Sequence, residues 1–290
     1  MSRLYVLGSG SRGNCCALEC DGAVLLIDAG FSAREVERRA RALGLVLGGV
    51  VGIALTHEHG DHACGAARLA ERLSAPILTA SGTWAQLGAA ARRAMFRPLR
   101  FGEDVRAGPF AVTACATSHD AAEPVAVVVT AIDGARVGVA YDLGRPTAAV
   151  RYLLRELTAL VLEANHDEVL LRTSGYPASV RQRIVGSGGH LSNRACAELI
   201  EELCHPGLAA VVLAHLSQRC NRADVARAEV EPALARAGYR GALYVAAQDE
   251  PLGPIALEPM TLGQPASAAP ASAAEEVRTR ELCRDPAGLR

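Results

Sequence analysis

The stretch Thr56-His57-Glu58-His59-Gly60-Asp61-His62 directly follows Val50-Val51-Gly52-Ile53-Ala54-Leu55, an apolar run typical of a buried strand. It places three imidazoles and two carboxylates within six residues, and such groups bind zinc, manganese or iron. The first two histidines project together, because side chains of extended chain repeat with a period of two. The glycine lets the chain turn and aim the last two ligands at a second position. We therefore predict one side of a two-metal centre; the alternative is a solvated polar turn.

Four other predicted apolar strands also end in a residue that can bind a metal, namely Asp28, His119, Asp142 and His215. Side chains at the ends of several strands meet at one edge of paired sheets, so we expect this set to lie beside the His57–His62 loop. A single histidine at a strand end is more often an ordinary surface group, and the prediction depends on the combination. For Asp28 two roles stay open: orienting the loop through hydrogen bonds, or capping a turn.

The composition predicts a globular protein of the cytoplasm. Of 290 residues, 50% are hydrophobic and 21% are charged, and the net charge of -1 excludes a global basic field for nucleic acid. A nucleic-acid partner would have to bind a local patch of arginine, since the chain contains no lysine. The nine cysteines form no CxxC pair, which favours free thiols over a zinc ribbon or a disulfide framework. There is no signal-peptide core and no apolar run long enough for a membrane, so we expect no membrane partner.

Turn and capping signals locate several elements. Asp21-Gly22 and Asp133-Gly134 predict two β-hairpins, and Ser32 with Glu35 predicts the start of a helix. Gly8–Asn14 is predicted as a tight turn, because it lacks the Lys-Ser/Thr that a phosphate-binding loop requires.

Further along, helices are predicted over Ala63–Leu73 and Arg194–Cys204, a loop with a short helix over Leu170–Val185, and a last strand over Leu243–Ala246. The segment 263–290 is rich in Ala, Pro and Ser and is predicted to be a disordered tail, which leaves 1–262 as one folded domain.

The motif His57-x-His59-x-Asp61-His62 resembles the HxHxDH hallmark of the metallo-β-lactamase-fold hydrolases. Further segments resemble the YycJ/WalJ-type exonuclease branch of that superfamily; they are Ser9–Cys15, Leu26–Ser32, Ser118–Ala121, Leu162–Asp167, Gly189–Asn193 and Ala214–Ser217. The resemblance covers about residues 3 to 248 and implies an α+β fold, the four-layer αββα sandwich. It leaves no room for the β-CASP insertion of larger nucleases between Asp142 and His215.

The resemblance also implies a site with two divalent metal ions, zinc or manganese. One ion would be bound by His57, His59 and His119, the other by Asp61, His62 and His215, with Asp142 bridging them. Asp61 would also act in catalysis, and His190 and Glu163 are similar to groups around the leaving oxygen in tRNase Z-type nucleases. The chain departs from the branch at Tyr141 and Leu143, where threonines commonly flank the aspartate.

For function, the resemblance implies phosphodiester hydrolysis, with a 5′-to-3′ DNA exonuclease as the specific expectation and single-stranded or end-containing DNA as the substrate. Arg172, Arg181, Arg183 and Arg219 either bind its phosphates or form a solvated face. The alternatives are hydrolysis of a small ester, thioester or lactam, an iron-dependent oxidoreductase, and a non-catalytic protein with structural metals. A set of His and Asp without Cys disfavours the last of these.

Overall fold

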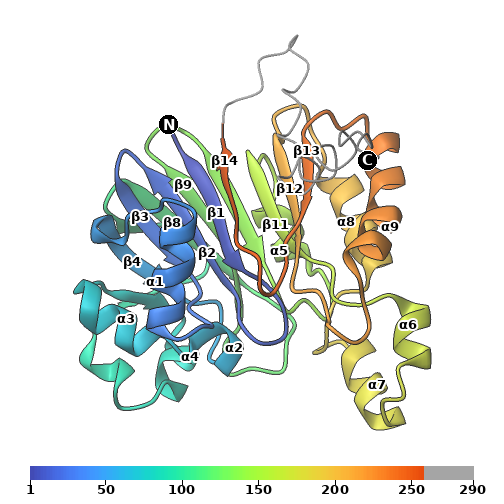
Figure 1. Ribbon diagram of the computed structural model, residues 1–290, viewed down its shortest axis with the longest axis horizontal. Coiled ribbons are helices and arrows are strands. Elements are labelled where there is room, and N and C mark those ends of the chain that lie inside the picture. The colour runs from blue at the N-terminus through green and yellow to red at the C-terminus, as the bar shows by residue number, and fades with distance from the viewer. Residues whose placement is uncertain (258–290) are drawn as a thin grey trace, which may run out of the picture.

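Several strands are buried on both faces; in β11 (Ala159–Glu163) and β12 (Ala210–Ala214) every residue is buried. Such strands must be covered on both sides. In the computed structural model, which describes residues 1–257, two β-sheets pack against each other and helices cover their outer faces (Figure 1). The predicted αββα sandwich is confirmed.

The first sheet has seven strands in the order β14-β1-β2-β3-β4-β5-β6. The strand β2 is antiparallel to both of its neighbours, β1 and β3, whereas β3 to β6 run parallel. The predicted hairpin turn at Asp21-Gly22 connects β2 to β3, with positive φ angles of 50° and 82°. The strands are β1 (Arg3–Gly8), β2 (Cys15–Cys20), β3 (Ala23–Ile27), β4 (Val50–Ala54), β5 (Ile77–Thr79), β6 (Phe96–Pro98) and β14 (Leu252–Ala256).

The second sheet also has seven strands, in the order β13-β12-β11-β10-β9-β8-β7. The strands β7 to β10 are antiparallel, and β10 to β13 run parallel. The second predicted hairpin is β9–β10, which turns at Asp133-Gly134. Besides β11 and β12, the strands are β7 (Val105–Ala107), β8 (Phe110–Ala116), β9 (Val125–Ala131), β10 (Arg136–Ala140) and β13 (Ala242–Val245).

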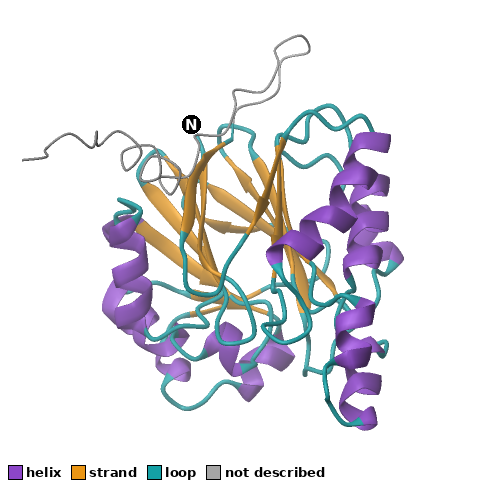
Figure 2. Cartoon of the chain, turned by 45° about the vertical axis from the view of Figure 1, so that its right-hand side comes forward, coloured by secondary structure: helices purple, strands orange, loops and turns teal. Residues whose placement is uncertain are grey.

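Three apolar cores separate the four layers (Figure 2). One lies between the sheets and contains Phe110 and Tyr141. The second lies beneath α5 (Ala148–Leu153), α8 (Asn193–Leu203) and α9 (Ala223–Arg236). The third lies beneath helices of the first half: α1 (Ala33–Ala42), α3 (Ala66–Leu73) and α4 (Ser81–Gln86). The remaining helical elements are α2 (Gly60–Ala63), α6 (Glu168–Thr173), α7 (Ala178–Val185), η1 (Leu47–Gly49) and η2 (Ala91–Arg93).

Three elements differ from the sequence-based prediction. The helix predicted over Ala63–Leu73 is divided into α2 and α3 at Gly65, whose backbone lies so close to Phe31 that a Cβ would be 2.0 Å from that residue's carbonyl oxygen. Leu170–Val185 contains two helices, α6 and α7, where one was predicted. The strand β14 was missed, because Pro254 lies within it and proline argues against a strand unless the strand is at an edge.

Further expectations concern the cysteines and the C-terminal tail. The eight cysteines in the described residues are free thiols, as predicted. The predicted tail at 263–290 lies outside the described residues. Across residues 1–257, no helix combines the length and the apolar character needed to cross a membrane.

Parallel pairing brings the ligand-bearing strand ends together. β3 and β4 run parallel in one sheet, and β10, β11 and β12 run parallel in the other. Their carboxyl ends therefore lie at the same edge of each sheet, which is where open α/β sheets place their sites.

Substitution of Gly30 can test how tightly the chain packs at the carboxyl ends of these strands. A Cβ there would lie 1.7 Å from the carbonyl oxygen of Asp61 and 2.6 Å from the backbone nitrogen of Asn14. We expect Gly30→Ala to lower the free energy of unfolding by about 1–3 kcal/mol in urea titrations, since the backbone must shift. The control is Gly48→Ala, where the nearest atom to a Cβ is 3.9 Å away and a change within about 0.5 kcal/mol is expected. Equal stability of the two variants would contradict this packing argument.

Candidate metal centre

Three residues at the strand ends adopt a left-handed backbone conformation: Asp28 after β3, Asp142 after β10 and His215 after β12, with φ angles of 60°, 51° and 53°. A positive φ is uncommon for residues other than glycine and costs about 1–3 kcal/mol. It turns the chain sharply where each strand ends and directs three polar side chains to the common edge. Backbone strain of this kind clusters at functional sites.

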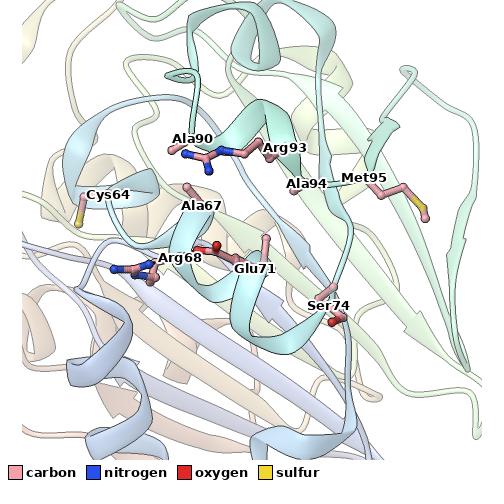
Figure 3. Close-up of a pocket in the computed structure, with 11 residues that line it drawn as sticks. Cys64, Ala67, Arg68, Glu71, Ser74, Ala90, Arg93, Ala94 and Met95 are labelled. Atoms are coloured by element: carbon pink, nitrogen blue, oxygen red, sulfur yellow. Dashed lines mark hydrogen bonds and ion pairs between the residues drawn. The ribbon is translucent and has the colours of Figure 1, made fainter.

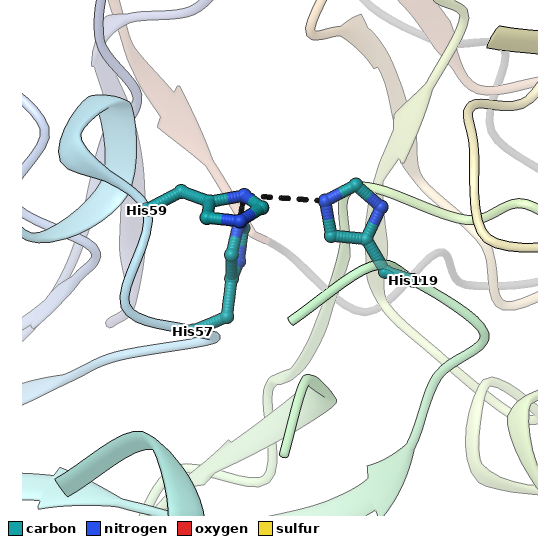
Figure 4. A group of neighbouring side chains, drawn as sticks. All are labelled: His57, His59 and His119. Carbon is teal, nitrogen blue, oxygen red and sulfur yellow. Dashed lines mark hydrogen bonds between the residues drawn. The ribbon is translucent and has the colours of Figure 1, made fainter. Parts of the chain in front are cut away.

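His57, His59 and His119 form the first ligand group (Figure 4). His59 Nδ1 lies 3.0 Å from His57 Nε2 and 3.3 Å from His119 Nε2. An imidazole nitrogen carries either a proton that it can donate or a lone pair that can accept one. His59 Nδ1 therefore cannot form good hydrogen bonds to both facing nitrogens at once. A cation placed between them satisfies three lone pairs at once, and neutral imidazole is a good ligand for zinc and manganese. These residues fit a divalent metal ion.

The second group joins Asp61, His62 and His215. Asp61 Oδ2 lies 3.5 Å from His62 Nε2 and 3.4 Å from His215 Nε2. Both imidazoles are buried, whereas the Asp61 side chain is 28% exposed. One carboxylate oxygen and two ring nitrogens converge here, and this donor set also fits a divalent ion with a side open to solvent.

Asp142 lies between the two groups. Its Oδ2 is 3.4 Å from His57 Nε2 and 2.9 Å from His62 Nε2, so one oxygen faces a member of each group. The side chain is almost fully buried. The structure thus brings all seven predicted ligands together, with the predicted bridging residue in the middle.

Asp28 orients the loop from behind. Its carboxylate accepts hydrogen bonds from the backbone N–H of Thr56 at 2.8 Å and from the Thr56 hydroxyl at 2.9 Å. It also lies 2.7 Å from His62 Nδ1, which can donate its proton to this carboxylate; Nε2 would then be the nitrogen that ligates a metal ion. Of the two roles left open by the sequence, the orienting role is confirmed.

Glu163 and His190 lie on the opposite side. Glu163, which is 0% exposed, has Oε1 at 2.7 Å from His190 Nδ1 and 3.1 Å from His215 Nδ1. Its Oε2 accepts the backbone N–H groups of Leu143 and Leu191 at 2.6 and 3.1 Å. Both carboxylate oxygens are therefore occupied, and Glu163 fixes the orientation of two imidazoles. The His190 side chain remains 25% exposed at the open side.

The charges of the site are set by burial and by neighbours. Burial by itself lowers the pKa of His190, but Glu163 and Asp142 outweigh it and raise this pKa to about 10, which keeps the imidazole protonated at neutral pH. His57 shows the opposite balance: burial and the nearby His62 hold its pKa well below the usual range. A neutral His57 retains the lone pair that ligation requires.

The Gly8–Asn14 segment, predicted only as a tight turn, also forms hydrogen bonds with the predicted metal site. The Ser9 hydroxyl accepts the backbone N–H of His215 at 2.8 Å and donates to the Asn14 side chain at 2.8 Å. The backbone N–H of Asn14 donates to the Asp61 carbonyl at 2.8 Å. This one turn therefore contacts ligand loops from both sheets. Its clustered Gly, Ser and Asn were visible in the sequence, but their partners were not.

A cavity of about 410 Å³ opens over the ligands, and its lining includes His59, Asp61, His119, Asp120, Arg183 and His190. The sequence had indicated a possible role in the site for all of these except Asp120, which follows a predicted ligand directly. A separate cavity of about 450 Å³ lies beside α3 (Figure 3). Its lining contains none of the predicted ligands, and the ion pair Arg68–Glu71 lies in it, so it has no part in this centre.

Comparison with known proteins agrees with the geometry. A model of the beta-lactamase superfamily domain matches residues 24–216. The chain is 31% identical over 238 residues to exodeoxyribonuclease YycJ of Bacillus anthracis, covering 81% of this chain and 89% of that protein. It is 27% identical over 240 residues to exodeoxyribonuclease WalJ of Streptococcus pneumoniae, with coverages of 80% and 88%. Among solved structures, the metallo-beta-lactamase fold protein YhfI of Bacillus subtilis superposes with a TM-score of 0.65 at 17% identity, covering 87% of this chain and 98% of that one.

The contact between Asp28 and His62 yields a prediction about metal affinity. Asn tolerates the left-handed backbone of position 28, but an amide has only one acceptor oxygen to serve Thr56 and His62. We expect Asp28→Asn to weaken metal binding by about 10–100-fold, measured by competition with a chromophoric chelator. The control Asp21→Asn, on the exposed hairpin turn, is expected to bind like the wild type. Unchanged affinity in Asp28→Asn would contradict the orienting role.

Proposed function

The chain belongs to the metallo-β-lactamase superfamily and is a metal-dependent hydrolase, and we propose that it is a dinuclear phosphodiesterase that degrades DNA from the 5′ end. One observation carries the choice among hydrolytic reactions: His190, held by Glu163, stands at the open side of the ligand cluster. A proton donor in that place suits the departure of a sugar oxygen. In this proposal residues 1–262 form the catalytic domain.

The seven converging side chains would bind two zinc or manganese ions. His57, His59 and His119 would ligate one, Asp61, His62 and His215 the other, and Asp142 would bridge them. When bound, such ions supply an activated water and stabilise negative charge on the phosphoryl oxygens.

The protein's own groups supply orientation and proton transfer. Asp61 is the most exposed member of its group, so its carboxylate can accept a hydrogen bond from the attacking water. His190 Nδ1 is occupied by Glu163, which leaves Nε2 free to donate a proton to the leaving oxygen. Glu163 acts through His190 and His215, as a positioning residue.

The relatives and the cavity both support this substrate class. Both curated relatives are named exodeoxyribonucleases. A cavity of about 410 Å³ is in the range that holds a ligand the size of one nucleotide, which suits attack at a strand end. Small esters, thioesters and lactams are the competing substrates. They favour an apolar pocket, whereas Asp120, Arg183 and His190 line this one.

The first prediction concerns Asp61. Metal-loaded protein should shorten a 5′-labelled single-stranded oligonucleotide and release labelled mononucleotide, and Asp61→Ala should reduce this rate to background. The control Asp224→Ala, on the exposed first turn of α9, should cleave at the wild-type rate. Cleavage that survives Asp61→Ala would contradict the proposed phosphodiesterase function. So would a wild type that hydrolyses thioesters and leaves oligonucleotides intact.

The second prediction separates acid catalysis from structural support. His190→Ala should lower kcat on an oligonucleotide by about 10²–10⁴, because the sugar oxygen then departs without a proton. On a p-nitrophenyl phosphodiester the loss should be far smaller, since p-nitrophenolate is stable without protonation. Equal losses on both substrates at equal metal content would show that His190 is not the general acid.

A further inference from the structure

The segment that includes α6 and α7 extends beyond the ends of the strands (Figure 1). The Asp167 carboxylate caps α6 by accepting the backbone N–H groups of Val169 and Leu170 at 3.0 and 2.7 Å. At the other end, the backbone N–H of His190 donates to the Ile184 carbonyl at 2.8 Å. This α6–α7 hairpin, residues 168–185, is thus held at its base and connected directly to the open side of the metal centre.

α7 is exposed on both sides. It has no buried residue, which is unusual for a helix that packs on a domain. Arg183 and Ile184 line the cavity over the metal centre. Arg181 lies on a groove of about 360 Å³ between α6 and α7, together with Arg172. The helix therefore contributes residues both to the reaction cavity and to a groove that it forms with α6.

The charges on this hairpin are not neutralised. Arg172, Arg181 and Arg183 have no carboxylate within ion-pair distance among residues 1–257. Some other surface arginines are paired, as in Arg222–Asp224 and Arg236–Glu201, and others within the described chain, such as Arg240, are not. The three on the hairpin differ from these by lining the reaction cavity or the groove beside it. The only carboxylate in the groove belongs to Glu168, and it is paired with Arg194. In a chain of net charge -1, this hairpin is a local basic surface.

We propose that the α6–α7 hairpin is the docking surface for a single-stranded polynucleotide, whose end enters the metal centre beside α7. Arg183 binds the phosphate next to the scissile one, and Arg172 and Arg181 bind phosphates farther along the strand. The inference rests on the proposed phosphodiesterase function and adds the path of the substrate. Guanidinium groups suit this task because they bind phosphate through two parallel hydrogen bonds.

The shape of the surface favours a single strand. The reaction cavity has the volume for one nucleotide. The groove places two arginines beside the exposed apolar side chain of Val185, and a basic groove that follows the backbone is typical of proteins that bind single strands. At the turn between the helices, the Arg219 guanidinium lies 4.5 Å from the centre of the Tyr176 ring and donates to the Ser174 carbonyl. Arg219 lines neither the reaction cavity nor the groove, so it is not counted among the phosphate ligands. Arg181 does line the groove; it donates one guanidinium N–H to the Tyr176 carbonyl and has further donors for a phosphate.

The test measures binding to a single-stranded phosphorothioate oligonucleotide, which resists hydrolysis, by fluorescence anisotropy with metal-loaded protein. Arg183→Ala should raise Kd about 10-fold and reduce the slope of log Kd against log[salt] by about 0.7, the contribution of one phosphate contact on a single strand. Combined replacement of Arg172 and Arg181 by Ala should reduce the slope by about 1.4. Arg183→Lys should retain most of the slope and bind less tightly than the wild type.

The matched control is Arg240→Ala, which should leave Kd and slope unchanged. Arg240 is exposed and lies just before β13, at the amino ends of the parallel strands, whereas the metal centre lies at their carboxyl ends. A wild type that cleaves oligonucleotides while the arginine variants keep its Kd and slope would overturn the docking surface and leave the proposed function intact. A wild type that neither binds nor cleaves any polynucleotide would overturn both.

Discussion

The contact of the Asp142 carboxylate with His57 and His62 joins the two halves of the molecule. His57 and His62 follow a strand of the first sheet, and Asp142 follows a strand of the second. A carboxylate this deeply buried is costly unless opposite charge or hydrogen-bond donors surround it. The imidazoles, and the metal ions that they fit, supply that compensation. The relative position of the two sheets is thereby coupled to the geometry of the site.

Other features support this contact from outside. Asp28 holds His62 from the side of the first sheet, and Glu163 holds His215 and His190 from the side of the second. The Ser9–Asn14 turn binds the backbone of both halves. The strained conformations of Asp28, Asp142 and His215 are maintained by these bonds, since strain persists only where the surroundings determine it. These hydrogen bonds therefore fix the orientation of the ligands.

Much of this could be predicted from the sequence, for an identifiable physical reason. Ligands that directly follow apolar strands, such as His57 and His215, have their position fixed by the edge of the sheet. The hairpins at Asp21-Gly22 and Asp133-Gly134 were equally predictable, because their turns have a strong local signal. Features that depend on long-range contact were not predictable: the division of one helix at Gly65, the edge strand around Pro254, and the bond from Ser9 to His215. For the arginines of α6 and α7, the sequence left open whether they face substrate or solvent, since their position beside the metal centre follows from the tertiary fold.

In the proposed function, ligands from two sheets form one dinuclear hydrolytic centre. Native mass spectrometry of the purified full chain, combined with elemental analysis, can count its metal ions. The expected result is two zinc or manganese ions per chain, both lost together on prolonged chelation, and no visible absorption band of iron. One ion per chain at saturating metal, or bound iron with such a band, would contradict it.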